Sequence, residues 1–133
     1  MTSNEYGISL VTSSKDNNIS SNDIIETVTA IEISQSSSNI ITDNHMGGDR
    51  YGIYITDSTG NTVFHNRFDS NTYQVISLNS KNVWDNGSSS GGNYWSDYRS
   101  LHPDATELDS SGIWNTPYNI NDSNQDNYPL VNS

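Results

Sequence analysis

Oxygen-bearing side chains that could bind a metal ion gather toward the end of the chain. Residues 84–133 hold seven of the 16 acidic residues and only one basic residue, Arg99. Carboxylate and amide oxygens are the ligands that calcium takes in proteins. An ion held by Asp104, Asp109 and Asn115 would also relieve the repulsion among closely packed carboxylates. A solvated acidic loop whose side chains form turns is the other interpretation, and the sequence leaves both open.

The charge balance of the whole chain restricts its partners. The 133 residues include 16 acidic and five basic side chains, which gives a net charge of −11. Such a chain binds nucleic acid poorly, because phosphate contacts need lysine and arginine. Cysteine is absent, so disulfides and thiolate metal sites are excluded. No apolar run approaches the length of a membrane span, and the first residues lack the basic and apolar regions of a secretory leader.

The elements that would position these side chains are short repeats. Apolar residues recur every 20–23 positions, in the columns Ile8, Ile31, Ile53 and Ile76; Leu10, Ile33, Ile55 and Leu78; Ile19, Ile41, Val63 and Val83; and Ile24, Met46 and Phe68. Within each repeat apolar and polar residues alternate, which is the period of a β-strand. Strands this short cannot bury a core alone, so we expect each repeat to wind one coil and stack on the next. Ile53 should then lie between Ile31 and Ile76.

One asparagine per repeat follows a core residue by three positions. These asparagines are Asn22, Asn44, Asn66 and Asn86. An amide at an inward-facing corner can bond the main chain of its turn and the amide of the next coil. Asparagine also simply favours turns, which is the alternative. We predict a ladder of these four side chains.

The repeat resembles a known family of solenoids. Gly-Ile-x-Ile, a turn rich in serine and asparagine, and then Asn-x-Val-x-x-Asn-x-Phe, as in residues 52–68, is similar to the parallel β-helix repeat of pectin-degrading enzymes and of NosD-like and CASH (carbohydrate-binding and sugar-hydrolysis) domains. The resemblance covers residues 6–86. It implies an all-β fold, a right-handed parallel β-helix of about four coils of 20–23 residues.

The last 50 residues differ in composition and contain all three tryptophans. The last coil of a β-helix exposes apolar side chains and strand edges that need a cover. We therefore expect coils over residues 1–83 and an irregular, aromatic-rich cap over residues 84–133. The cap should be built from Trp84, Tyr94, Trp95, Tyr98, Trp114, Tyr118 and Tyr128. Alternatively, Trp95, Tyr98 and Trp114 form a platform that stacks against sugar rings.

The tail also resembles the ending of many archaeal NosD-like surface proteins. The shared segments are GNYWSDY at 92–98, TPY at 116–118 and DNYPL at 126–130. In those proteins an Asp/Asn/Gly-rich run that looks like a calcium loop precedes the TPY segment. This chain has Asn115 where they have aspartate, so the resemblance implies a weakened calcium site.

Catalytic chemistry has only scattered candidates. The resembling enzymes that cut polysaccharides use several acids on adjacent coils, which here would be Asp43, Asp49, Asp57 and Asp69. None of the hydrolase motifs accompanies them, and aspartate is first a turn former. His45 and His65 should point in different directions on either side of the asparagine ladder, and His102 is distant. We expect no active site and no copper or zinc site, so the copper role associated with the NosD name is not expected to transfer.

The expected function is that of a non-catalytic structural or carbohydrate-binding module of a secreted or cell-surface protein. A remnant of a polysaccharide lyase or hydrolase and a NosD-like accessory protein of metalloenzyme maturation remain the alternatives. The start of the chain shows no cap to match the tail, which leaves the strand edge near Tyr6 exposed. We therefore expect the chain to be part of a longer protein. Its expected partners are extracellular glycans or other copies of itself.

Overall fold

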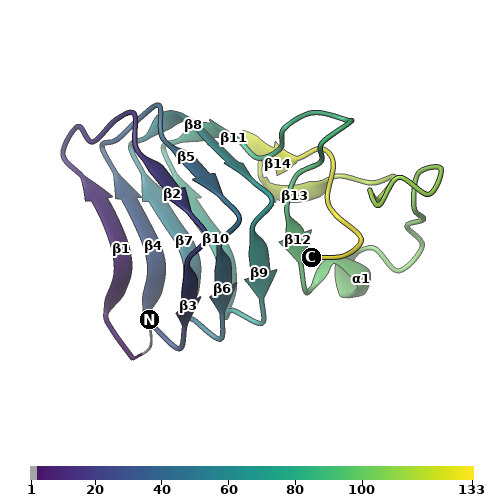
Figure 1. Ribbon diagram of the computed structural model, residues 1–133, viewed down its shortest axis with the longest axis horizontal. Helices are drawn as coiled ribbons and strands as arrows, with labels where there is room; N and C mark the ends of the chain where they lie inside the picture. Colours follow the sequence, from purple (N-terminus) through teal and green to yellow (C-terminus); the bar gives the residue numbers. More distant parts are fainter. Residues whose placement is uncertain (1–2) are drawn as a thin grey trace.

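The computed structural model describes residues 3–133, which form a stack of four β-coils closed at one end by an irregular tail (Figure 1). Each coil contributes one strand to each of three parallel sheets. The chain is therefore a parallel β-helix, as predicted. Among residues 3–133, no helix is long and apolar enough to cross a membrane.

The three sheets differ in strand length. The long sheet contains the six-residue strands β1 (Tyr6–Val11), β4 (Thr29–Ser34), β7 (Tyr51–Thr56) and β10 (Tyr73–Leu78). The second sheet contains β2 (Asn18–Ser20), β5 (Ile40–Thr42), β8 (Thr59–Phe64) and β11 (Lys81–Val83). The third sheet contains β3 (Asp23–Ile25), β6 (His45–Gly47), β9 (Arg67–Asp69) and β12 (Tyr94–Trp95).

The corners between sheets recur at the same place in every coil because the same backbone conformation is built there. Gln35, Asp57 and Asn79 follow the long strands, and each has a φ of 49°. This left-handed region disfavours most side chains but tolerates aspartate and asparagine. The 22-residue spacing of these residues thus sets the bend that returns the chain to the next sheet.

The interior contains the predicted apolar columns. Ile31, Ile33, Ile53 and Ile55 are fully buried, and Ile31 pairs with Ile53 as Ile33 pairs with Ile55. At about 25 cal/mol per Å² of apolar surface, each such side chain contributes about 1.5–3 kcal/mol to folding. The narrow apolar interior of the stack can therefore stabilise the fold, although only 31% of the residues are hydrophobic.

The predicted register of the fourth coil is wrong by one residue. Val75, and not Ile76, pairs with Ile53, so that Ile76 and Leu78 lie on the outer side of β10. Val83 is 51% exposed, and Trp84 occupies the interior instead. Because side chains alternate along a strand, a shift of one residue moves every one of them to the opposite face. The sequence pattern predicted Ile76 at the position opposite Ile53, which Val75 occupies in the structure.

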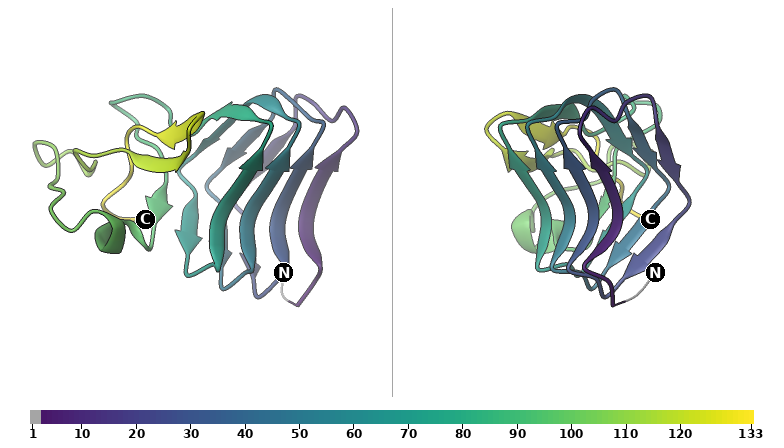
Figure 2. Two further views of the ribbon diagram at one scale, coloured as in Figure 1. Left: turned by 180° about the vertical axis from the view of Figure 1, so that it is seen from behind. Right: turned by 90° about the vertical axis from the view of Figure 1, so that its left-hand side faces the viewer.

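The tail covers the end of the stack next to β10, β11 and β12 (Figure 2). It contains a single helical turn, α1 (Tyr98–Leu101), and an antiparallel hairpin of β13 (Tyr118–Asn121) and β14 (Asn124–Asp126). The Phe68, Trp95 and Tyr118 rings stack in series, with centroids 4.3 and 4.0 Å apart. Five of the seven predicted cap aromatics are buried, namely Trp84, Trp95, Tyr98, Trp114 and Tyr118. Tyr94 and Tyr128 are only half-buried.

Candidate functional site

Asparagine side chains form a ladder along the corner between the second and third sheets. The Oδ1 atom of Asn66 accepts hydrogen bonds from the backbone N–H and the Nδ2 of Asn44, both at 3.0 Å. Asn44 binds Asn22 in the same way, at 3.0 and 2.9 Å. Each Nδ2 group also donates to a main-chain carbonyl, such as that of Ile41 for Asn66. The ladder therefore satisfies main-chain groups that the corner would otherwise leave unpaired.

Asn93, and not Asn86, is the fourth member of this ladder. Asn93 Oδ1 accepts from the N–H and Nδ2 of Asn66, both at 3.0 Å. Asn86 is exposed in a serine- and glycine-rich loop, where its Nδ2 donates to Ser90 Oγ at 3.1 Å. The prediction of Asn86 assumed a constant repeat, whereas the last coil makes an excursion through this loop before it returns to β12.

A second ladder, which the sequence analysis missed, follows the corner between the long and second sheets. Its members are Asn17, Asn39, Asn61 and Asn82. Asn39 donates from its N–H and Nδ2 to Asn61 Oδ1 at 2.9 and 3.0 Å. The 22-residue spacing of Asn17, Asn39 and Asn61 was a readable signal.

The tail hairpin ends both ladders with the same geometry. Asn124 Oδ1 accepts from the N–H of Asn82 and from Trp84 Nε1, at 2.9 and 3.1 Å. Asp126 Oδ2 accepts from the N–H of Asn93 and from Trp95 Nε1, at 2.7 and 2.9 Å. In each case the tryptophan lies two residues after the last asparagine of the ladder. The tail therefore supplies a final acceptor to each ladder and buries two indole rings in the process.

Asp126 is the most deeply buried acid of the tail. Its side chain is fully buried, and Tyr128 also donates a backbone N–H to it at 3.0 Å. Burial raises the pKa of Asp126 to about 7, while the hydrogen bonds from Asn93, Trp95 and Tyr128 act in the opposite direction. Gly92 makes room for this carboxylate, because a Cβ at that position would collide with it.

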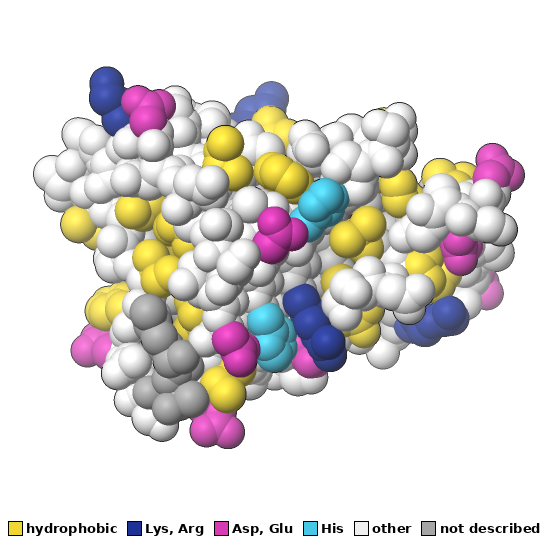
Figure 3. All heavy atoms as spheres, viewed as in Figure 1, with side chains coloured by type: hydrophobic (Ala, Val, Ile, Leu, Met, Phe, Trp, Pro, Cys, Tyr) yellow, Lys and Arg dark blue, Asp and Glu magenta, His cyan; other side chains and the backbone are white. Residues whose placement is uncertain are grey.

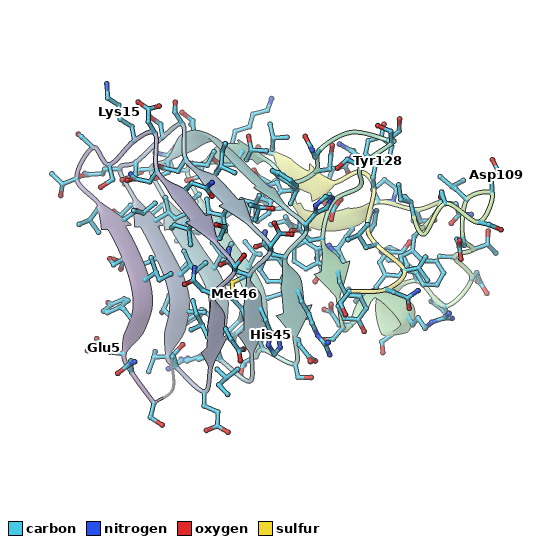
Figure 4. All side chains as sticks on the ribbon, in the orientation of Figure 1. Glu5, Lys15, His45, Met46, Asp109 and Tyr128 are labelled. Carbon is cyan, nitrogen blue, oxygen red and sulfur yellow. The ribbon has the colours of Figure 1, made fainter. Side chains whose placement is uncertain are left out.

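The structure gives the calcium candidates other surroundings than a closed site. Asp104 and Asp109 are exposed, and Asp109 lies at the outer tip of the tail (Figure 4). Asn115 Oδ1 accepts from the Thr106 N–H at 3.1 Å and from Thr116 Oγ1 at 2.9 Å. Within residues 3–133, no three histidine or acidic side chains are grouped so as to hold a metal ion. Calcium binding at Asp104, Asp109 and Asn115 stays a prediction.

The predicted aromatic platform is wrong. Trp95, Tyr98 and Trp114 are 2%, 2% and 6% exposed, so that their rings cannot meet a sugar. Tyr98 stacks on Trp114 at 5.0 Å, and the Arg99 guanidinium covers the Trp114 ring at 4.7 Å. The apolar end of the last coil must be shielded from water, and these three rings are buried because they shield it.

Exposed aromatic rings lie instead on the outer side of the long sheet. Tyr6, Thr29, Tyr51 and Tyr73 occupy one column of the long sheet, one residue per coil, and of these four Thr29 is buried. Tyr51 and Tyr73 stack with centroids 5.5 Å apart and planes 17° apart. Tyr54 meets the Tyr51 ring edge-on at 5.1 Å. The Tyr-Gly pairs at 6–7 and 51–52 are the sequence signal for this column.

A cavity of about 210 Å³ lies beside Tyr73, between β10 and the tail. Its walls are formed by residues 71–75, Asp97 and residues 118–120. Asp97 is held in place by Gln74, which donates to Oδ1 at 3.3 Å, and by the Tyr118 hydroxyl, which donates to Oδ2 at 3.0 Å. Burial, followed by the charge of Asp97, raises the pKa of Tyr118, so its hydroxyl keeps its proton and remains a donor.

The two histidines of the coils are paired with different groups. His45 Nδ1 lies 2.8 Å from Asp23 Oδ1, whereas His65 Nε2 lies 2.8 Å from the Ser90 carbonyl. Figure 3 shows two separate histidine patches, in cyan, on one face of the molecule. His45 and His65 nevertheless border one hollow of about 210 Å³, together with Asp43 and Arg67, although the sequence predicted different directions for them.

The comparisons with known proteins gave one match. A family model described as "Periplasmic copper-binding protein (NosD)" matches residues 1–100. Neither the comparison with curated proteins nor that with solved structures found a significant match.

The side chains of this chain do not fit a copper centre. Copper in proteins favours clustered histidine and sulfur ligands. The sequence has no cysteine, and Met46 is fully buried in the apolar core. His45 and His65 are bonded to Asp23 and Ser90, and no three histidine or acidic groups cluster among residues 3–133. No chemistry is therefore assigned to copper in this chain.

Proposed function

We propose that this chain, which belongs to the NosD family, is a non-catalytic module of an extracellular or cell-surface protein that binds carbohydrate on the outer side of its long sheet. The observation that carries this proposal is the set of tyrosines on that surface. Tyr6 and Tyr73 are 46% and 48% exposed, and Tyr51 and Tyr54 are half-buried beside them. Solvated aromatic rings on a flat, rigid sheet suit stacking against the apolar face of a sugar.

The rigidity of the coils supports a structural role for the same module. Two asparagine ladders run through the stack and end on tail side chains, so that buried corner groups are paired from the first coil to the last. A pre-organised surface loses little conformational entropy on binding. An extended ligand such as a polysaccharide matches a long sheet to which each coil adds one strand.

The lyase or hydrolase alternative has less support. Asp43 and Asp57 adopt left-handed turn conformations with φ of 58° and 49°. Asp49 is buried at a corner, where it accepts from Thr27, and Asp69 is bonded to Arg67 and Ser70. Asp43, Asp49 and Asp57 lie at three different corners and Asp69 ends β9, so the four acids are not gathered at one site. We therefore propose that the module does not cut its ligand.

The alternative of an accessory role in metalloenzyme maturation rests on the family match alone. That match also favours a location outside the cytoplasm, since the family is described as periplasmic. A titration of the protein with copper tests this alternative. We expect no stoichiometric binding, because within residues 3–133 no three histidine or acidic side chains are grouped so as to hold a metal ion, and Met46 is buried in the apolar core.

A glycan array followed by calorimetry tests the proposed function. We expect binding to one class of neutral glycan that weakens when the tyrosines of the long sheet are replaced. Incubation with the same glycan should release no shorter or unsaturated products. Absence of binding to any glycan on the array would refute the carbohydrate role, and release of products would refute the non-catalytic one.

A further inference from the structure

We propose that the cavity between Tyr73 and the tail hairpin is the subsite for one neutral sugar ring. This inference rests on the carbohydrate role proposed above and assigns it to named groups. Tyr73 would stack on the ring, and Asp97 and Asn119 would bind its hydroxyls.

Tyr73 is the aromatic residue at the end of the tyrosine column. Tyr51 is engaged by three neighbours, namely the stacked Tyr73 ring, the edge of Tyr54 and the guanidinium of Arg50 at 5.3 Å. β10 is the last strand of the long sheet, so no further coil continues the column beyond Tyr73. The cavity occupies that position, with Asn119 and Ile120 of β13 in its wall. A sugar ring there would extend the aromatic stack by one layer.

Asp97 provides a fixed hydrogen-bond acceptor in the same cavity. Each of its oxygens accepts one bond, from Gln74 and from the Tyr118 hydroxyl respectively. An ionised carboxylate offers about four lone-pair sites, so capacity remains for sugar hydroxyls. The exposed amide of Asn119 adds both a donor and an acceptor. One aromatic face with a few oriented polar groups is the usual composition of a small-ligand site.

The size and charge of the cavity select the ligand class. Its volume of about 210 Å³ is smaller than the roughly 300–1,000 Å³ typical of drug-sized ligands, which suits a single ring. The cavity wall contains the acidic residue Asp97 but no lysine or arginine. With a net charge of −11, the protein repels acidic sugars. The geometry therefore points to a neutral sugar and against uronic acids and sulfated sugars.

The test compares Tyr73, in the cavity wall, with a tyrosine of the third sheet. Calorimetry would measure binding of neutral gluco-, manno-, galacto- and N-acetylglucosamine oligosaccharides, with polygalacturonate as the anionic probe. We expect Tyr73→Ala to weaken the best neutral ligand about tenfold, the equivalent of one lost aromatic contact. Tyr94→Ala is the matched control, because Tyr94 lies in β12 of the third sheet and outside the cavity wall, and it should change affinity less than twofold.

Two further variants keep the result interpretable. Tyr73→Phe retains the ring and should bind nearly as the native protein does. Asn119→Ala alters an exposed side chain, so it should fold normally and still weaken binding. If Tyr73→Ala and Asn119→Ala bind as tightly as the native protein, the subsite is refuted while the carbohydrate role stands. If no oligosaccharide binds, both fail, and tighter binding of polygalacturonate overturns the neutral ligand class.

Discussion

The two ends of the stack satisfy the same ladder chemistry in opposite ways. At the tail end, the N–H groups of Asn82 and Asn93 face Asn124 and Asp126, and the whole junction is buried. At the other end, the first members of the ladders are Asn17, which is exposed, and Asn22, which is half-buried. The hydrogen bonds of each ladder run one way, with the Oδ1 atom of each coil accepting from the coil before it.

This polarity explains why the tail end needs a dedicated cover. The last coil presents N–H donors in a buried setting, and an unpaired buried donor costs about 1–3 kcal/mol. The first coil presents carbonyl oxygens of side chains, which water can satisfy at an exposed edge. A ladder whose hydrogen bonds all run in one direction therefore has two unequal ends, and the coils and the tail can be tested separately.

The largest effect is expected in the coils. Ile53→Asp places an unpaired charge between Ile31 and Val75, at a fully buried position. The loss should exceed about 4 kcal/mol, a large part of the stability of a small domain. Circular dichroism should then show no cooperative thermal transition.

Ile76→Asp is the control for this change. Ile76 lies on the outer side of the next strand, so the cost should be about 1 kcal/mol or less. A similar loss of stability in both variants would contradict the register of β10 against β7.

The next effect concerns the junction between ladder and tail. Asn93→Ala removes a side chain that accepts from Asn66 and donates to the carbonyls of Val63 and Trp84. We expect a loss of about 1–3 kcal/mol, measured by urea unfolding. Asn86→Ala should leave the unfolding midpoint unchanged, since Asn86 is exposed in its loop. The reverse result would restore Asn86 to the ladder.

The coils could be predicted from the sequence and the tail junction could not, for a physical reason. Stacked coils repeat the same environment, so Ile31, Ile53 and the asparagines keep a nearly constant spacing that can be read without coordinates. Asn124 and Asp126 act at long range, 42 and 33 residues from Asn82 and Asn93. No period connects these pairs. The aromatic content of the tail predicted a cap, but not that Trp84 and Trp95 would be held by ladder acceptors.

The stability of the tail should depend on pH through the buried carboxyl group of Asp126. Burial raises its pKa from 3.8 to about 7, so its contribution to stability is complete below about pH 4 and is lost as the pH rises to about 7. The melting temperature of the tail, followed by tryptophan fluorescence, should therefore fall across this interval. Burial also raises the pKa of Asp49 and adds a slope of the same sign in the coils.

Asp126→Asn separates the two contributions. An amide oxygen can still accept from Asn93 and Trp95, but it does not titrate in this range. The variant should lose most of the pH dependence seen by fluorescence. An unchanged slope would assign the effect to groups other than Asp126.

Calcium should give the smallest effect and distinguishes the two interpretations of the acidic loop. Asp104 and Asp109 are exposed, and the Asn115 oxygen is already used by Thr106 and Thr116, so few strong ligands remain for an ion. Binding should then be weak, with a dissociation constant of about 10⁻⁴–10⁻³ M, as in extracellular modules. A tenfold excess of calcium over that constant stabilises the bound state by about 1.4 kcal/mol, which is a shift of a few degrees.

Calorimetry with and without calcium measures that shift in the tail, and the coils, which contribute none of these ligands, should melt unchanged. An Asp104→Asn, Asp109→Asn double variant is the matched control, because it removes both carboxylates at exposed positions and should abolish the shift. Identical melting profiles of the native protein in calcium and in chelator would refute the site. The acidic loop would then be a solvated turn, and the tail would be held by Asn124, Asp126 and the packing of its aromatic rings alone.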